Sequence, residues 1–387
     1  MASPHTILER DEFRTLDQLA RTDFRAWSIA HERDGKLPVE NLTRIHELGL
    51  LHAAATSNNG GRDGSLLGRD PGVFLQAVRT IARGDSSTAH CYQVHNHTLW
   101  LLEELGTPQQ RERFLQPLTS RFSLLASVGS EPGRTNMYVM QTKAKRVDGG
   151  WQLNGVKNFA TNGPLADYIV AFVAIDGVDD YFKNHMMVIL EPDMPGITLS
   201  DDWYQPHGMR AARSSVITLH DVFVPDSHVL GEPGSYPKGR WQGRYHLGFA
   251  ANYLGASEGL YGWYLDYIKG RGRAANAITQ LRTGEMRITL DSAAALFNVA
   301  IESWQKSDVV ASELISMSAK SAAAHAAFKL TQTVVHASGA TAQFDEHPLG
   351  RYIRDLETHV LHAGHDRTAQ ILGQAELGEQ FDSTLQR

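Results

Sequence analysis

The stretch DGGWQLNGVKNFATNG occupies residues 148–163, and its turn pairs enclose short runs rich in β-branched and aromatic residues. This alternation of turn signals with short apolar runs is typical of β-strands joined by tight turns. Three similar runs follow at 168–175, 186–190 and 215–219. Together they predict an antiparallel β domain over residues 121–235, either a small barrel or a sandwich.

Helical patterns flank this β segment on both sides. Residues 1–120 carry apolar side chains at steps of three and four, which predicts an N-terminal helical domain. Longer stripes follow in residues 236–387, and one of them comprises Leu247, Ala251, Leu254, Glu258, Tyr261, Leu265 and Ile268. They predict a C-terminal four-helix bundle, so the chain is an α+β protein of three domains. Because several stripes are wide, we expect burial between subunits of a homo-oligomer.

Composition excludes several classes of protein. The chain has 387 residues, 42% of them hydrophobic, and a net charge of −6, which argues against disorder and against nucleic-acid binding. The single cysteine, Cys91, excludes an internal disulfide and a zinc site of several thiolates. We find no signal-peptide pattern and no apolar run near the ~20 residues that span a bilayer, so we expect a cytoplasmic protein without membrane contact.

The motifs that usually reveal a cofactor or a nucleophile are missing. The chain has no phosphate-binding loop, no Gly-x-Gly-x-x-Gly between a strand and a helix, and no Gly-x-Ser-x-Gly elbow. Histidines stand out instead, at His95 and His97 and again at His359, His362 and His365. They could ligate a metal, although no ligand set is complete, or act as acids and bases near neutral pH. They could equally be ordinary surface or core residues among the 18 histidines of the chain.

Several motifs in the right order resemble the acyl-CoA dehydrogenase family. The stretch 148–163 is similar to that family's middle domain, as are SEPG at 130–133, HDVFVP at 220–225 and VLG at 229–231. The resemblance covers nearly the whole chain and implies a flavin. It places Ser130 and Thr161 in hydrogen bonds to the flavin ring and Phe159 over one face of that ring. Without the resemblance, Phe159 would be read as a core residue and Thr161 as a turn residue.

The catalytic glutamate of that family has no counterpart at either usual position. Alignment on Arg354-Asp355 places the first position at Ala363, and the second falls at about Tyr245. Without a carboxylate base, removal of an α-proton would lose about 10²–10⁴-fold in rate. Glu258 is the candidate for a relocated base, although a residue on an apolar stripe can also form a buried ion pair or face a partner subunit.

The departures point toward the flavin-dependent monooxygenase branch, the group of dibenzothiophene monooxygenase. RDLETHVLH at 354–362 resembles that group, His95 matches an active-site histidine, and Trp203 matches a residue of the pocket. That group commonly has an acidic residue and a proline after the second histidine, whereas this chain continues with AGH at 363–365, which puts substrate contacts there in doubt.

The resemblance also bears on the cofactor. In the family an Arg-x-x-Phe-Gly element holds the nucleotide half of FAD, and this element is absent after Ile268. Arg271 and Arg273 stand there instead and are candidate cofactor-binding residues. This favours FMN over FAD. In this branch a separate NAD(P)H:flavin reductase supplies reduced flavin, and O₂ adds to it as a hydroperoxide.

The leading hypothesis is therefore a two-component monooxygenase, a homotetramer that oxygenates sulfur, nitrogen or an aromatic carbon and uses no metal. His95, His359 and His362 would hold the distal oxygen and relay its proton, Thr161 would bond the flavin N5, and the substrate pocket would include Trp203, Tyr245 and Glu258. Two alternatives stay open: an FAD-dependent acyl-CoA dehydrogenase with a relocated base, and a flavin-binding scaffold without catalysis.

Overall fold

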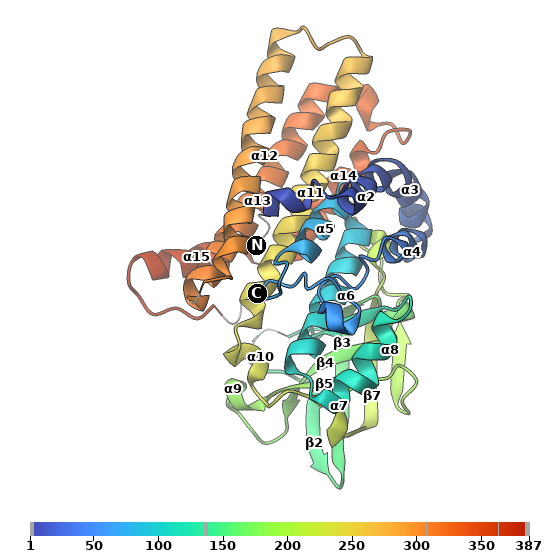
Figure 1. The fold of residues 1–387 in the computed structure, drawn as a ribbon, viewed down its shortest axis with the longest axis vertical. Coiled ribbons are helices and arrows are strands. Elements are labelled where there is room, and N and C mark those ends of the chain that lie inside the picture. Colours follow the sequence, from blue (N-terminus) through green and yellow to red (C-terminus); the bar gives the residue numbers. More distant parts are fainter. Residues whose placement is uncertain (1–3, 135, 137, 307, 363, 384–387) are drawn as a thin grey trace.

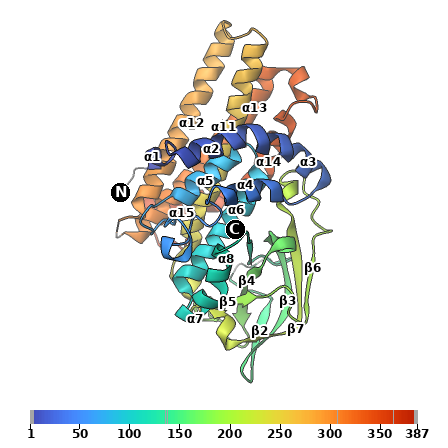
Figure 2. The same cartoon turned by 45° about the vertical axis from the view of Figure 1, so that its right-hand side comes forward.

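The computed structural model describes residues 4–134, 136, 138–306, 308–362 and 364–383. Helices form the two ends of the chain and a single sheet lies between them in sequence, as predicted (Figure 1). Figure 2 shows the sheet at one end of the molecule, with the long C-terminal helices extending from the other end. None of the helices in the described part of the chain is long and apolar enough to cross a membrane.

The N-terminal segment is helical and packs around one long buried helix. Its helices are α1 (Pro4–Ile7), α2 (Asp11–Leu19), α3 (Arg25–Asp34), α4 (Val39–Glu47), α5 (Val73–Ala82), α6 (Ser86–Leu105), α7 (Pro108–Gln110) and α8 (Gln116–Thr119). Asp85 caps α6, because its carboxylate accepts a hydrogen bond from the amide of Ser87. Nearly every residue of α6 is buried, so this helix is surrounded by protein on all sides.

The middle segment forms one sheet with the strand order β6-β7-β3-β2-β4-β5-β8, and β1 also pairs with β4. The strands are β1 (Leu125–Val128), β2 (Lys143–Val147), β3 (Gly150–Thr161), β4 (Tyr168–Ile175), β5 (His185–Leu190), β6 (Ile197–Ser200), β7 (Ser214–Pro225) and β8 (Val229–Leu230), with α9 (Tyr181–Asn184) before β5. The prediction of a purely antiparallel sheet is wrong in one respect. β4 pairs with the edge of β2 that does not face β3, and it runs parallel to β2. It also pairs in parallel with β1.

A buried ion pair joins β3 to the loop that follows β1. Lys157 and Glu131 both have fully buried side chains, and the Lys157 Nζ lies 2.8 Å from a Glu131 carboxylate oxygen. The same carboxylate accepts hydrogen bonds from the amides of Gln141 and Thr142, at 2.7 and 2.8 Å. Burial lowers the pKa of Lys157 to about 8, against the opposing effect of Glu131. The buried ion pair therefore holds three backbone segments together: β3, the loop after β1 and the segment that begins β2.

The C-terminal segment is the predicted bundle. It consists of α10 (Ser235–Lys238), α11 (Trp241–Gly270), α12 (Ala277–Ser303), α13 (Val309–Ser338), α14 (Leu349–His359) and α15 (His365–Glu376). The two helical segments share one hydrophobic core although they lie far apart in sequence. At the crossing of α5 and α11, a Cβ added to Gly255 or Gly259 would lie 2.0 Å from the backbone oxygen of Arg79 in α5 or of Arg83 directly after it. Only glycine permits so close an approach of two helices.

We predict that Glu131→Gln lowers the free energy of unfolding by about 3–5 kcal/mol, because it leaves the Lys157 ammonium buried without a counter-charge. Urea unfolding at constant m-value measures this change. The double variant Glu131→Gln, Lys157→Met should recover part of the loss. If Glu131→Gln is as stable as the wild type, the ion pair does not stabilise the contact between the loop and β3.

Candidate functional site

A cavity of about 550 Å³ opens where α6, the end of β3, the loop before β7 and the end of α14 meet. The side chains that define its chemistry are His90, Phe159, Thr161, Met209, Ser214 and His359. Its volume is in the range of small-molecule sites, ~300–1,000 Å³. No carboxylate is among the described residues that line it.

A break in the β3–β7 pairing turns the side chain of Phe159 toward the cavity. The register shifts between Lys157 and Ala160, and Phe159 adopts a left-handed backbone with φ of 62°. A non-glycine residue in this conformation is uncommon and often marks a functional site. The Phe159 ring is 49% exposed, and Trp203 stands edge-on to it with 5.0 Å between ring centroids. The two rings form one open aromatic surface, of which Phe159 lines the cavity and Trp203 lies beside it, outside the lining.

Hydroxyl and imidazole groups line the deeper part of the cavity. Thr161 Oγ1 lies 2.9 Å from Ser214 Oγ and 3.3 Å from His90 Nε2. The rings of His90 and His359 meet edge to face, with 4.8 Å between centroids. Burial lowers the pKa of His90 to about 4, and burial together with His90 lowers the pKa of His359 far below its ordinary value. Both imidazoles are therefore neutral at pH 7 and can each donate one N–H and accept one hydrogen bond.

His90 is the histidine of α6 that reaches the cavity, and the sequence did not single it out. His95 lies five residues later, which turns its side chain well away from that of His90 on a helix of 3.6 residues per turn. The sequence signals for His90 were weak, because its proximity to Thr161 depends on how the sheet docks on α6.

His95 lies inside the protein in a chain of hydrogen bonds. The amide of Leu125 donates to its Nδ1 at 3.0 Å, so the ring proton lies on Nε2 and donates to His52 Nδ1 at 2.9 Å. His52 Nε2 then donates to the carbonyl of Arg121 at 3.0 Å. Burial lowers the pKa of His52 to about 4 and that of His95 far below its ordinary value. In this structure His95 joins α6 to β1.

Three further predicted site residues are not placed in the cavity lining by the structure. Ser130 is not among the residues lining the cavity, and its carbonyl accepts the amide of Asn158 at 3.1 Å. Tyr245 stacks on His97 with 4.1 Å between centroids, also outside the cavity lining. For His362 only the backbone, in a 3₁₀ turn after α14, is within the described part of the structure, and its side chain lies outside it.

Arg271 and Arg273 lie at the exposed turn between α11 and α12. In Figure 1 this turn is at the end of the bundle remote from the sheet. Within one chain, these two guanidinium groups therefore cannot reach the cavity.

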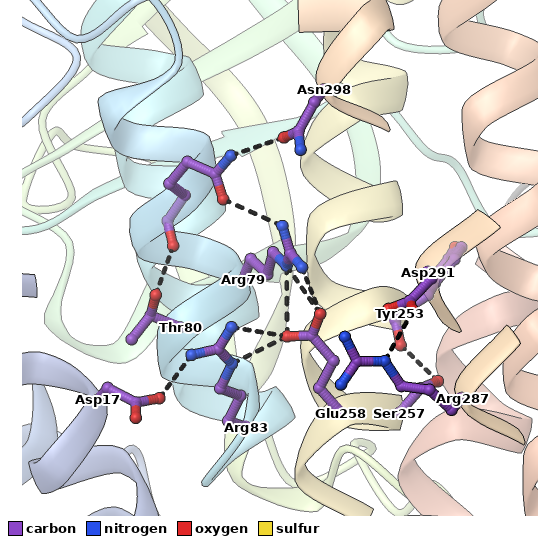
Figure 3. A network of polar contacts seen from close by, with 11 residues as sticks. Asp17, Arg79, Thr80, Arg83, Tyr253, Ser257, Glu258, Arg287, Asp291 and Asn298 are labelled. Atoms are coloured by element: carbon purple, nitrogen blue, oxygen red, sulfur yellow. Dashed lines mark hydrogen bonds and ion pairs between the residues drawn. The ribbon is translucent and has the colours of Figure 1, made fainter. Parts of the chain in front are cut away.

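Glu258 lies between Arg79 of α5 and Arg83, the residue directly after that helix, as Figure 3 shows. Its carboxylate accepts hydrogen bonds from Arg79 Nε at 3.1 Å and from Arg83 Nε at 2.8 Å. Burial alone would raise the pKa of Glu258, but the two guanidiniums lower it to about 2. A carboxylate so strongly stabilised as an anion is a poor proton acceptor. The structure therefore assigns Glu258 to the crossing of α5 and α11.

The cavity fits the ring system of a flavin. A flavin ring needs an aromatic or apolar wall and a few fixed hydrogen-bonding groups beside it. Phe159 provides the wall, with Trp203 packed edge-on against it, and the hydroxyls of Thr161 and Ser214 provide polar groups. Among the described residues, no three His, Cys, Asp or Glu side chains gather in a way that could hold a metal ion.

This fold and cavity are those of a flavin oxidoreductase built from helices, sheet and helices. Family models for the N-terminal, middle and C-terminal domains of acyl-CoA dehydrogenase match residues 9–121, 126–222 and 247–367. The chain belongs to the acyl-CoA dehydrogenase family.

Both monooxygenases and acyl-CoA dehydrogenases are among the relatives that are similar to the chain. It is 26% identical to dibenzothiophene monooxygenase of Mycolicibacterium goodii, over 89% of each chain. It is also 26% identical to the mitochondrial short-chain specific acyl-CoA dehydrogenase of Rattus norvegicus, over 93% of this chain and 89% of the relative.

Solved structures of a dibenzothiophene monooxygenase and of an acyl-CoA dehydrogenase have the same fold as the chain. TdsC from Paenibacillus sp. A11-2, in complex with FMN and indole, superposes with a TM-score of 0.86 at 23% identity and covers 97% of this chain and 98% of its own. Butyryl-CoA dehydrogenase from Megasphaera elsdenii gives a TM-score of 0.85 at 24% identity, over 95% and 98%.

We predict that Glu258→Gln lowers the free energy of unfolding by about 3–5 kcal/mol but leaves flavin affinity unchanged, because it breaks the buried pair at a distance from the cavity. The matched control is Asp291→Asn on α12, which breaks an exposed pair with Arg287 and should change stability little. Chemical denaturation and flavin titration measure the two quantities. Loss of flavin binding in a folded Glu258→Gln variant would contradict the assignment.

We further predict that the protein loses stability as the pH falls from about 6.5 toward 4. The folded pKa of His52 and His95 is below the unfolded value of ~6.5, so the unfolded chain takes up protons first and unfolding becomes easier. His95→Gln should cost about 1–3 kcal/mol at pH 7.5 and make this pH dependence shallower by about one proton. Urea midpoints across the pH range test this, and an unchanged slope in the variant would refute it.

Proposed function

We propose that the chain is a two-component, reduced-flavin-dependent monooxygenase. The observation that carries this proposal is the pair of neutral imidazoles, His90 and His359, in a cavity whose described lining has no carboxylate. A dehydrogenase needs a base to remove the α-proton of its substrate, whereas Glu258 is held by two arginines. FMN is favoured over FAD, and a separate reductase would supply it in reduced form.

The reaction would join one atom of O₂ to a small organic substrate at sulfur, nitrogen or an aromatic carbon. When bound, reduced flavin would supply the two electrons, and the second oxygen atom would leave as water. The relatives with monooxygenase names, and the TdsC complex with FMN and indole, support a flat substrate beside FMN. The aromatic surface of Phe159 and Trp203 suits a flat ligand of this kind.

The residues of the chain would orient the reactants and control protons. The hydroxyl of Thr161, fixed by Ser214, would hydrogen-bond the flavin edge, while His90 beside it would donate or accept a proton. His359, edge-on to His90, would hold the reacting oxygen from the other side. Phe159, Tyr204 and Met209 would exclude water, which protects reactive species from hydrolysis.

We also infer a homotetramer. Three large apolar side chains of α12, Ile278, Leu281 and Ile288, are each more than half exposed. Apolar side chains gathered on one helix of a monomer often mark an interface between proteins. A partner chain covering α12 would bury them.

The test supplies the enzyme with FMN, a reductase, NADH and O₂, using indole or dibenzothiophene as substrate. We expect His90→Ala and His359→Ala each to lower product formation by about 10²-fold or more, because proton control is lost, and to raise the share of oxygen released as H₂O₂. The exposed His336→Ala on α13 is the matched control and should behave as wild type. Chromatography of the product and a peroxide assay measure the two yields.

Two results would overturn the proposal. One is wild-type product formation in both cavity variants. The other is loss of flavin absorbance when a short acyl-CoA is added to the FAD-loaded enzyme without oxygen, which would show a dehydrogenase. A protein that binds flavin but neither oxygenates a substrate nor reacts with an acyl-CoA would be the scaffold instead.

A further inference from the structure

Lys320 is buried in α13, and no described residue supplies it with a counter-charge. The residue is fully inaccessible to solvent, and among the described residues its Nζ has one hydrogen-bond partner, Thr368 Oγ1 on α15, at 3.5 Å. No described carboxylate acts on its pKa, on which burial is the only influence. Burial lowers the pKa of Lys320 to about 8, so most molecules still carry the ammonium at pH 7. A buried cation is normally paired, because removing it from water is costly.

His246 of α11 is a second buried group without a partner in this region. It is fully buried, and neither ring nitrogen has a hydrogen-bond partner among the described residues. Burial and the charge of Lys320 both lower the pKa of His246 far below its ordinary value. The ring is therefore neutral and has one N–H group to donate. A buried polar group without a partner calls for an explanation, and a bound ligand is one.

The start of α15 contributes the third feature. Gly364 precedes this 12-residue helix and offers no side chain to cap its first amides. Such amides attract an anion, because they lack partners and lie at the positive end of the helix dipole. Thr368, which contacts Lys320, belongs to the start of this helix, and Asp366 in its first turn is exposed to solvent. Gly364 also lines the cavity described above, so the start of α15 adjoins the proposed flavin site.

We propose that Lys320, His246 and the first turn of α15 form a binding site for one oxyanion, a carboxylate or phosphate group of the ligand held in the adjoining cavity. The site would give the ammonium its counter-charge and His246 an acceptor for its N–H group. Which molecule carries the oxyanion rests on the proposed function. The oxyanion is either the phosphate of FMN or an acidic group of the substrate. The existence of the site rests on the buried side chains and the start of α15, and not on the reaction.

The first experiment needs neither flavin nor oxygen. The melting temperature of the purified chain is measured at pH 7 against increasing inorganic phosphate or acetate, with chloride at equal ionic strength as the reference. We expect a saturable rise in the wild type, because a ligand that binds only the folded state stabilises it. Lys320→Met should weaken anion binding at least tenfold, and His246→Phe should weaken it by a smaller factor.

The matched control is Lys329→Met, which removes an exposed lysine from the same helix and should leave the saturable rise unchanged. If Lys320→Met fails to fold, Lys320→Arg keeps the positive charge and should keep the rise while His246→Phe reduces it. The absence of a saturable rise in the wild type overturns the proposal, and so does an equal rise in all variants.

The second experiment identifies the source of the oxyanion. Affinities for FMN and for riboflavin, which lacks the phosphate, are compared in the wild type and in Lys320→Met. If the flavin phosphate occupies the site, the wild type prefers FMN and the variant loses that preference. If an acidic substrate occupies it, the preference is unchanged and only the response to acetate is lost. Because the first experiment does not depend on oxygenation, failure of the monooxygenase assay leaves its result standing.

Discussion

The buried ion pair between Lys157 and Glu131 is the interaction on which the candidate site most depends. Lys157 precedes Phe159 and Thr161 by two and four residues, and its ammonium also contacts the carbonyl of Gly129 at 3.3 Å. The strand that carries the aromatic wall is thereby tied to the loop that carries Ser130. A local break in the β3–β7 pairing then turns Phe159 outward, at a backbone conformation that needs such surrounding support.

Burial is the second constraint, and it decides the chemistry. His90 and His359 lie among apolar and aromatic side chains, so their pKa values fall and both rings stay neutral at physiological pH. Glu258 is also buried, yet two guanidiniums keep it ionised and unreactive. Desolvation therefore keeps the histidines of the cavity neutral. At the crossing of α5 and α11 the charges of two arginines outweigh desolvation, and Glu258 stays in a structural ion pair.

Local sequence patterns predicted much of the fold. The run at 168–175 is strand β4, and the stripe from Leu247 to Ile268 lies within helix α11, because side-chain periodicity follows directly from backbone geometry. The parallel pairing of β4 with β2 was not predictable in this way, since it depends on which free edge the strand reaches. The shared core of the two helical segments also escaped prediction, because it joins residues far apart in the chain.

The sequence by itself determined the family, the turn-rich segment that carries Phe159 and Thr161, and the lack of a glutamate at Ala363 and Tyr245, because these are properties of residue identity and order. Only the tertiary structure decided that His90, not His95, faces Thr161, and that Glu258 is bound by Arg79 and Arg83. The physical reason is that the direction of a side chain on a buried helix acquires meaning only when the neighbouring elements have docked. Periodicity gives the relative angles of α6 side chains, and packing decides which of them meets the cavity.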